Sequence, residues 1–286
     1  MTSYQHVYVH VPFCARRCSY CDFAIAVRAH VPVADYIRAV EDELTLRAIR
    51  NNVALDTLYL GGGTPSRLGA DGVARLIGSL RKRLTIADDA EVTVEANPDD
   101  IHPGVVERWK AAGVNRVSLG VQSFDPAVLT WMHRSHNVAD VERAISMLRD
   151  EQIDDWSLDL IYALPPEIPR DWAADVERAV ELAPPHISAY GLTVEPATPL
   201  ARWRARGEAT EADEERYEHD FLFVDSQLRN SGYDHYEVSN YARNGQRARH
   251  NSAYWKGVPY LGVGPAAHGF DGETRRWNVR EYAAWR

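Results

Sequence analysis

The stretch Cys14-Ala-Arg-Arg-Cys18-Ser-Tyr-Cys21 contains every cysteine of this 286-residue chain and follows a short apolar run at 7–11. Cysteines so few and so close together are a poor disulfide framework, because an odd number leaves one thiol unpaired, and a good set of metal ligands. Spacings of four and three residues let one short loop place the thiolates around three irons of a cubane cluster. The fourth iron then keeps an open position for a substrate or cofactor.

A structural zinc site is the alternative interpretation of the same cysteines. Zinc normally takes four ligands from paired C-x₂₋₄-C sets, and the chain has no second set. Arg16 and Arg17 lie between the ligands, where positive charge favours thiolates and offsets the negative charge of a cluster. The pattern therefore predicts a [4Fe–4S] cluster bound by Cys14, Cys18 and Cys21.

Short β-rich runs alternate along the chain with stretches whose apolar residues recur at helical spacing. The expected strands are 7–11, 57–60, 91–95, 116–121, 157–162 and 186–191, and the clearest helical patterns fall within 37–48, 73–84, 138–148 and 172–180. This alternation indicates βαβ units in a parallel sheet, either a partial barrel or a doubly wound open sheet. In both architectures the carboxyl ends of the strands carry the active site.

Composition and charge exclude several classes of protein. The net charge of −9 argues against nucleic acid as the main ligand, because phosphate contacts need clustered Lys and Arg. The first residues lack the basic and apolar regions of a secretory signal, and no apolar run of about 18 residues could span a membrane. We therefore expect a cytoplasmic protein, with peripheral membrane contact left open.

The pattern changes after about residue 191, where a charged stretch at 202–218 is followed by a tyrosine-rich segment. We expect a core domain at 1–200 and an accessory or lid region at 201–286. The chain stops within an expected helix at 279–286 that has no cap.

The C-x₃-C-x₂-C motif just after the first strand resembles the radical S-adenosylmethionine (SAM) superfamily. The resemblance implies a partial (β/α)6 barrel of the TIM type. It also implies that the amino and carboxylate groups of SAM chelate the open iron. Reduction of the cluster then cleaves SAM to methionine and a 5′-deoxyadenosyl radical.

Further polar segments fall at the same edge of the expected sheet. The glycines of Gly61-Gly62-Gly63-Thr64-Pro65 let backbone amides approach a ligand closely, although a tight strand-to-helix turn explains them equally well. Glu95 ends the third strand, where a carboxylate can bind ribose hydroxyls or simply lie on the surface. Gln122 and Asp159 come at or near the ends of the next two strands, where inward polar side chains usually have a ligand or a buried partner.

Four segments, 8–14, 61–65, 120–124 and 159–165, look like the oxygen-independent coproporphyrinogen III oxidase family, in the same order and over nearly the whole chain. This resemblance implies SAM contacts at matching positions. These are Tyr8, Tyr20, Gly62, Gly63, Thr64, Glu95, Gln122, Arg134 and Asp159. Catalytic residues beyond these contacts are not assigned.

The sequence departs from the oxidase pattern in three ways. The oxidases carry a further cysteine where this chain has Phe23, and they have an extension before the cluster motif. In addition, His250-Asn-Ser-Ala-Tyr254-Trp255 resembles the His-Asn-x-x-Tyr-Trp signature of the HemW-type heme chaperones within this family. All three departures favour the chaperones.

The chaperone resemblance implies heme contact by His250, Tyr254 and Trp255, with histidine as an axial ligand and the aromatic rings on the porphyrin face. The alternative is a histidine satisfied by hydrogen bonds beneath an aromatic cluster. His268 is a second candidate, expected to line the cofactor pocket or the barrel mouth.

Three functions follow from the resemblance. The first is a heme chaperone that binds heme and passes it to an acceptor protein. The second is a coproporphyrinogen III oxidase that decarboxylates propionates to vinyl groups, and the third is another radical reaction on a tetrapyrrole or a different substrate. Whether the protein is an enzyme stays open, and heme or a porphyrinogen, an acceptor and an electron donor are the expected partners. Members of the family usually continue into a small C-terminal helical domain, and this chain is expected to end before or within it.

Overall fold

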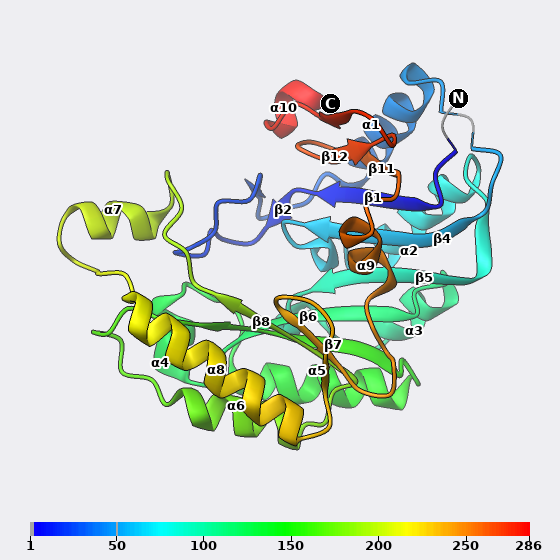
Figure 1. Ribbon diagram of the computed structural model, residues 1–286. Helices are drawn as coiled ribbons and strands as arrows, with labels where there is room; N and C mark the ends of the chain where they lie inside the picture. The colour runs from blue at the N-terminus through cyan, green and yellow to red at the C-terminus, as the bar shows by residue number, and fades with distance from the viewer. Residues whose placement is uncertain (1–2, 50) are drawn as a thin grey trace.

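A single eleven-stranded sheet forms the centre of the computed structural model, which describes residues 3–49 and 51–286 (Figure 1). Its strands lie in the order β13-β12-β11-β1-β4-β5-β6-β7-β8-β10-β9. The six central strands are parallel and follow chain order: β1 (His6–Val11), β4 (Leu55–Gly62), β5 (Ile86–Ala96), β6 (Arg116–Gln122), β7 (Asp155–Tyr162) and β8 (His186–Gly191). All six expected strands are confirmed. Because a doubly wound sheet reverses its strand order and this sheet does not, the fold is a partial barrel.

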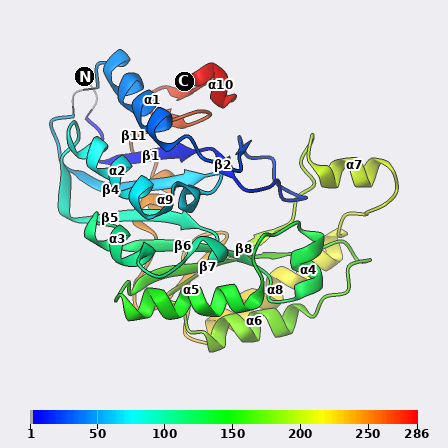
Figure 2. The same ribbon diagram turned by 180° about the vertical axis from the view of Figure 1, so that it is seen from behind.

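Helices cover the outer face of the central strands (Figure 2). They are α1 (Val33–Leu46), α2 (Gly69–Arg81), α3 (Val105–Ala111), α5 (Val138–Asp150) and α6 (Trp172–Glu181), with α4 (Pro126–Trp131) and the 3₁₀ turns η1 (Pro65–Leu68) and η2 (Pro98–Asp100) at strand ends. Side chains start several of these helices: the Asn137 side chain and Asp140 form a capping box at α5, and Asp171 accepts from the Ala174 amide at α6. Such caps satisfy amides that a helix leaves without partners.

The two faces of the sheet differ in chemistry, because side chains alternate along each strand. On β1, Val7, Val9 and Val11 are fully buried against the helices, each side chain contributing about 1.5–3 kcal/mol. His6 and His10 point to the inner face, which is polar on every central strand. A closed barrel of this type fills its interior with branched apolar side chains. The inner face of this sheet is polar instead, which favours a ligand-binding cavity over a packed apolar interior.

Residues after 200 add helices and extend both edges of the sheet. The segments concerned are α7 (Pro199–Ala205), α8 (Glu214–Asn230), β9 (Asp234–His235), β10 (Asn240–Ala242), β11 (Tyr260–Val263), β12 (His268–Phe270) and β13 (Arg275–Trp277). β10 pairs with β8 at one edge, and β11 pairs in parallel with β1 at the other. α8 packs beside α6, where Trp172 Nε1 donates to the Asp220 carbonyl at 3.0 Å. Strand edges need partners, and this segment supplies them at both sides of the barrel.

One short helix, α9 (Arg249–Trp255), lies on the inner face of the sheet (Figure 1). Glu91 of β5 accepts hydrogen bonds from the amides of Arg249 at 2.7 Å and His250 at 2.9 Å, so a buried strand carboxylate caps the helix. The last helix, α10 (Tyr282–Trp285), is shorter than the expected 279–286, because Asn278 and Val279 are held in backbone hydrogen bonds to Ala267 and Ala266. No helix in the described part of the chain is long and apolar enough to cross a membrane.

Candidate cluster and cofactor site

The cysteine loop is fixed at its base and at its middle. The short strands β2 (Phe13–Cys14) and β3 (Ala26–Val27) pair in parallel and close the loop. At its middle, the Ser19 amide donates to the Met132 carbonyl at 3.1 Å, and the Ser19 carbonyl accepts from the Leu200 amide at 2.8 Å. The loop is therefore anchored to α7 and to the end of α4.

Two of the three cysteine thiols contact side chains from other segments of the site. Cys14 Sγ lies 3.3 Å from Thr64 Oγ1, and Cys18 Sγ accepts a hydrogen bond from Arg134 Nη1 at 3.4 Å. Burial raises the pKa of the Cys14 and Cys21 thiols to about 11, so cluster binding would release protons from them.

The donor set fits a cluster better than a single ion. Within residues 3–49 and 51–286, no three His, Cys, Asp or Glu side chains converge closely enough to hold one metal ion. Thiolates on a cubane bind different irons and need not converge on one point. The loop, its all-sulfur donors and its neighbouring guanidinium groups thus fit a [4Fe–4S] cluster.

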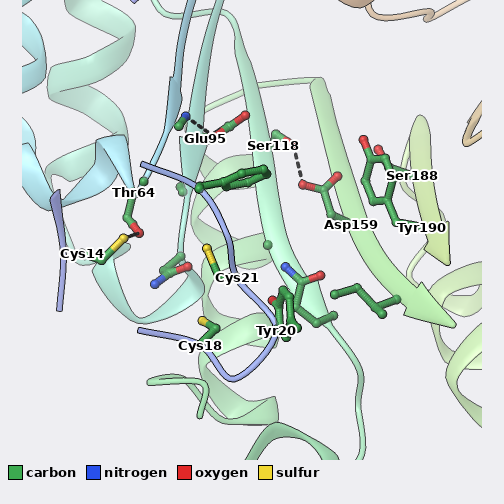
Figure 3. A pocket seen from close by; sticks show the side chains of 18 of the residues that line it. Cys14, Cys18, Tyr20, Cys21, Thr64, Glu95, Ser118, Asp159, Ser188 and Tyr190 are labelled. Atoms are coloured by element: carbon green, nitrogen blue, oxygen red, sulfur yellow. Dashed lines mark hydrogen bonds between the residues drawn. The ribbon is translucent and has the colours of Figure 1, made fainter. Parts of the chain in front are cut away.

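A cavity of about 410 Å³ opens beside the cysteines (Figure 3). The carboxyl ends of β4 to β8 form its walls, and Asn251 of α9 also lines it. The predicted residues that line this cavity are Cys14, Cys18, Tyr20, Cys21, Gly62, Gly63, Thr64, Glu95, Gln122, Arg134 and Asp159. Tyr8 does not line it; this residue lies beyond Gly62 and Glu95 in a neighbouring cavity.

The glycines after β4 are required by close packing. Gly62 has φ of 112°, and a Cβ there would lie 2.5 Å from the His10 ring. A Cβ on Gly63 would lie 2.7 Å from the carbonyl group of Pro12. Only glycine lets the end of β4 approach the segment that leads into the cysteine loop. The tight-turn interpretation therefore holds, and the turn also brings the backbone to the cavity wall.

Glu95 points toward the cavity from the end of β5 (Figure 3). Its Oε1 accepts from the Tyr59 hydroxyl at 2.8 Å, and its Oε2 accepts from the Gly62 amide at 2.9 Å. Burial raises the pKa of this carboxyl to about 7, although both hydrogen bonds oppose the shift. The group is thus held in one orientation while it keeps lone pairs for a further donor.

Two more charged groups of the cavity have polar atoms without partners in the described part of the chain. Asp159 Oδ2 accepts from Ser118 Oγ at 2.8 Å, but the buried Oδ1 has no hydrogen bond. Arg134 Nη2 donates to Asn97 Oδ1 and to the Gly120 carbonyl, both at 2.7 Å, whereas its Nε has no partner. Because buried polar atoms are nearly always paired, these atoms fit a site that is completed by a polar ligand.

Comparison with known proteins agrees with this geometry. The model of the radical SAM superfamily matches residues 8–179. The protein named heme chaperone HemW from Mycobacterium tuberculosis is 42% identical over 278 residues, which cover 96% of this chain and 71% of the relative. The Escherichia coli protein of the same name is 35% identical, covering 92% of this chain and 69% of the relative. The chain belongs to the HemW family of radical SAM proteins. Membership of the superfamily implies a [4Fe–4S] cluster and SAM.

A solved structure supports the same fold for this HemW-family chain. Coproporphyrinogen III oxidase (HemN) from Escherichia coli, described as a radical SAM enzyme, superposes with a TM-score of 0.83 at 26% identity. The match covers 98% of this chain and 68% of that chain. The predicted family and the predicted partial barrel are both confirmed.

His250 of α9 is buried in the barrel interior. The ring is 0% exposed; Nδ1 lies 2.6 Å from Thr57 Oγ1, and Nε2 lies 2.8 Å from the Tyr254 hydroxyl. Burial lowers the pKa of His250 to about 3, so the ring is neutral. With both nitrogens in hydrogen bonds, His250 fits the alternative interpretation, a satisfied histidine among aromatic rings. Heme contact by His250 stays a prediction.

The two aromatic residues of the same segment lie nearer the surface. Trp255 is 65% exposed, and Tyr254 packs edge-on against Tyr260 with ring centroids 4.6 Å apart. Tyr254 lines the neighbouring cavity, which also contains Tyr8 and His268. His268 therefore lies in that second cavity and not in the cavity beside the cysteines.

Several lining residues are not among the predicted ones. They are the inner-face residues Thr93, Arg116, Ser118, Ser157, His186, Ser188 and Tyr190. On β5, β6 and β7 these residues lie an even number of positions from Glu95, Gln122 or Asp159. On β8 they lie two positions from one another. Period-two alternation within the expected strands could have identified them, since side chains two apart share a face.

Proposed function

We propose that this protein is a heme chaperone: it binds heme and delivers it to an acceptor protein, under the control of a [4Fe–4S] cluster and SAM. The observation that carries the proposal is the match to proteins named heme chaperone HemW, at up to 42% identity over 96% of this chain. Phe23, at the position where the oxidases have a further cysteine, agrees with it.

Cys14, Cys18 and Cys21 would hold the cluster, and the cavity beside them would hold SAM. When bound, the reduced cluster would supply the electron for reductive cleavage of SAM. Gly62 and Gly63 let the backbone approach the cofactor, Glu95 offers a fixed acceptor for hydroxyl groups, and the free Oδ1 of Asp159 offers another. Arg134 orients the site by joining Cys18, Asn97 and the end of β6.

The oxidase is the second candidate, because the HemN structure superposes at a TM-score of 0.83. It would use the same cluster and cofactor residues to start oxidative decarboxylation of a porphyrinogen propionate. The two functions differ in what leaves the protein: unchanged heme in one case, a vinyl product in the other.

The test is an anaerobic heme titration of the reconstituted protein, followed by transfer to an apo-globin as a surrogate acceptor. We expect saturable binding and transfer of intact heme. Absence of saturable binding would overturn the chaperone proposal. Formation of vinyl porphyrinogen from coproporphyrinogen III under reducing conditions with SAM would establish the oxidase instead.

A further inference from the structure

A second cavity of about 590 Å³ lies next to the cofactor cavity and shares Phe23, Gly62 and Glu95 with it. Aromatic side chains from distant parts of the chain form its walls: Tyr8, Phe23, Tyr254, Tyr260 and Phe270. Its volume falls in the range of about 300–1,000 Å³ that is typical of pockets for organic ligands. Flat, largely apolar walls suit a planar ring system.

Two arginines of this cavity can pair with an anionic group. Arg275 and Arg280 are exposed at its lining, and the Arg275 guanidinium lies 5.5 Å from the centroid of the Phe270 ring. The acidic residues of the lining are Asp22 and Glu95. Glu95 already accepts two hydrogen bonds, from Tyr59 and from the Gly62 amide. Two guanidinium groups beside aromatic walls match a planar molecule with two carboxylates.

The two histidines that line this cavity, His10 and His268, differ in whether their ring nitrogens make hydrogen bonds. His10 Nδ1 lies 3.0 Å from the Tyr8 hydroxyl, and its Nε2 donates to the Ala24 carbonyl at 2.8 Å. His268 is exposed; its ring stacks on Trp277 with centroids 5.9 Å apart and has no hydrogen bond to the residues that the structure describes. Of the two histidines that line the cavity, only His268 can offer a nitrogen to a metal without breaking a contact.

We propose that this second cavity is the heme site: His268 ligates the iron, Arg275 and Arg280 pair with the propionates, and Phe23 and Tyr254 pack on the ring. The inference rests on the proposed heme function and specifies where heme binds. In this proposal His250 holds α9 in place, and Tyr254 is the residue of the His-Asn-x-x-Tyr-Trp segment that contacts heme. Because Phe23 borders both cavities, heme here would lie beside the cluster loop, where occupation of one cavity can affect the other.

The experiment is an absorbance titration of the full chain with ferric heme and, separately, with the dimethyl ester of the same heme, which lacks the two negative charges. Wild type, H268A, R275E/R280E and R276E are compared. R276E is the matched control, since Arg276 is the neighbour of Arg275 on β13 but faces another cavity, where it pairs with Asp271 at 3.1 Å. Thermal melting checks that each variant is folded.

We expect R275E/R280E to weaken heme binding at least tenfold and to change binding of the dimethyl ester less than twofold. R276E should bind both as wild type does. H268A should lose the absorbance bands of histidine-ligated heme, and added imidazole should restore them. If wild type binds heme but neither H268A nor R275E/R280E differs from it, the site assignment is wrong while the proposed function stands. If wild type binds no heme, both fail.

Discussion

Glu95 on β5 accepts a hydrogen bond from the backbone amide of Gly62 on β4, with 2.9 Å between the nitrogen and Oε2. The contact joins two segments that the sequence separately indicates as cofactor contacts. It also holds a carboxylate in a site where burial raises its pKa to about 7. Proton binding at Glu95 is therefore coupled to folding.

This coupling predicts the pH dependence of stability of the cluster-free protein. The pKa of Glu95 is higher in the folded state, about 7 against 4.5 when unfolded, so the folded state binds more protons between these values and stability falls as pH rises through them. E95Q lacks the titration. Between pH 5 and pH 8, wild type should therefore lose on the order of 2 kcal/mol of unfolding free energy that E95Q does not lose. Urea unfolding under reducing conditions measures the difference, and parallel pH curves for the two proteins would contradict it.

The geometry of Gly62 predicts a specific sensitivity. In G62A, the Cβ would meet the His10 ring at 2.5 Å on a backbone with φ of 112°, and we expect a loss of about 2–4 kcal/mol of stability. G78A is the control: Gly78 lies inside α2, a Cβ there meets nothing within 4 Å, and the variant should gain roughly 0.5–1 kcal/mol. Equal stability of the two variants by thermal melting would show that the turn tolerates a side chain.

The cysteine loop predicts the metal content of the protein. After anaerobic reconstitution, wild type should hold about four irons and four sulfides per chain, and replacement of Cys14, Cys18 or Cys21 by alanine should reduce both strongly. F23A is the control, because Phe23 is 61% exposed beside the loop and is not a ligand. Iron and sulfide analysis of each variant measures the cluster content. Stoichiometric zinc in place of iron would favour a structural zinc site.

The two hydrogen bonds of His250 predict a structural role. H250A removes a buried ring and leaves Thr57 and the Tyr254 hydroxyl without their partner, so it should lose about 2–4 kcal/mol of stability. W255A, at an exposed position of the same helix, should change stability by less than about 0.5 kcal/mol. Heme affinity of the folded H250A protein should stay within twofold of wild type. A selective loss of heme binding at unchanged stability would instead support His250 as a ligand.

The sequence alone determined the features that depend on local spacing. The interval between Cys14, Cys18 and Cys21 defines a ligand set within one loop, and strand periodicity located all six central strands. The polar residues at strand ends followed from the rule that parallel strands present their carboxyl ends at one edge. These signals lie within a few residues of each other and need no knowledge of the rest of the chain.

Only the tertiary structure decided how distant segments combine. His250 lies 193 positions from Thr57, yet the hydrogen bond between them holds the histidine in the barrel interior. The parallel pairing of β11 with β1 likewise brings β11, β12 and β13 to one edge of the sheet and helps to place Tyr254, His268 and Arg275 around the cavity that Phe23 borders. Such contacts depend on which strand edges pair and which face a side chain takes. No spacing along the sequence encodes these choices, because the free energy that selects them comes from burial and hydrogen bonding across the whole fold.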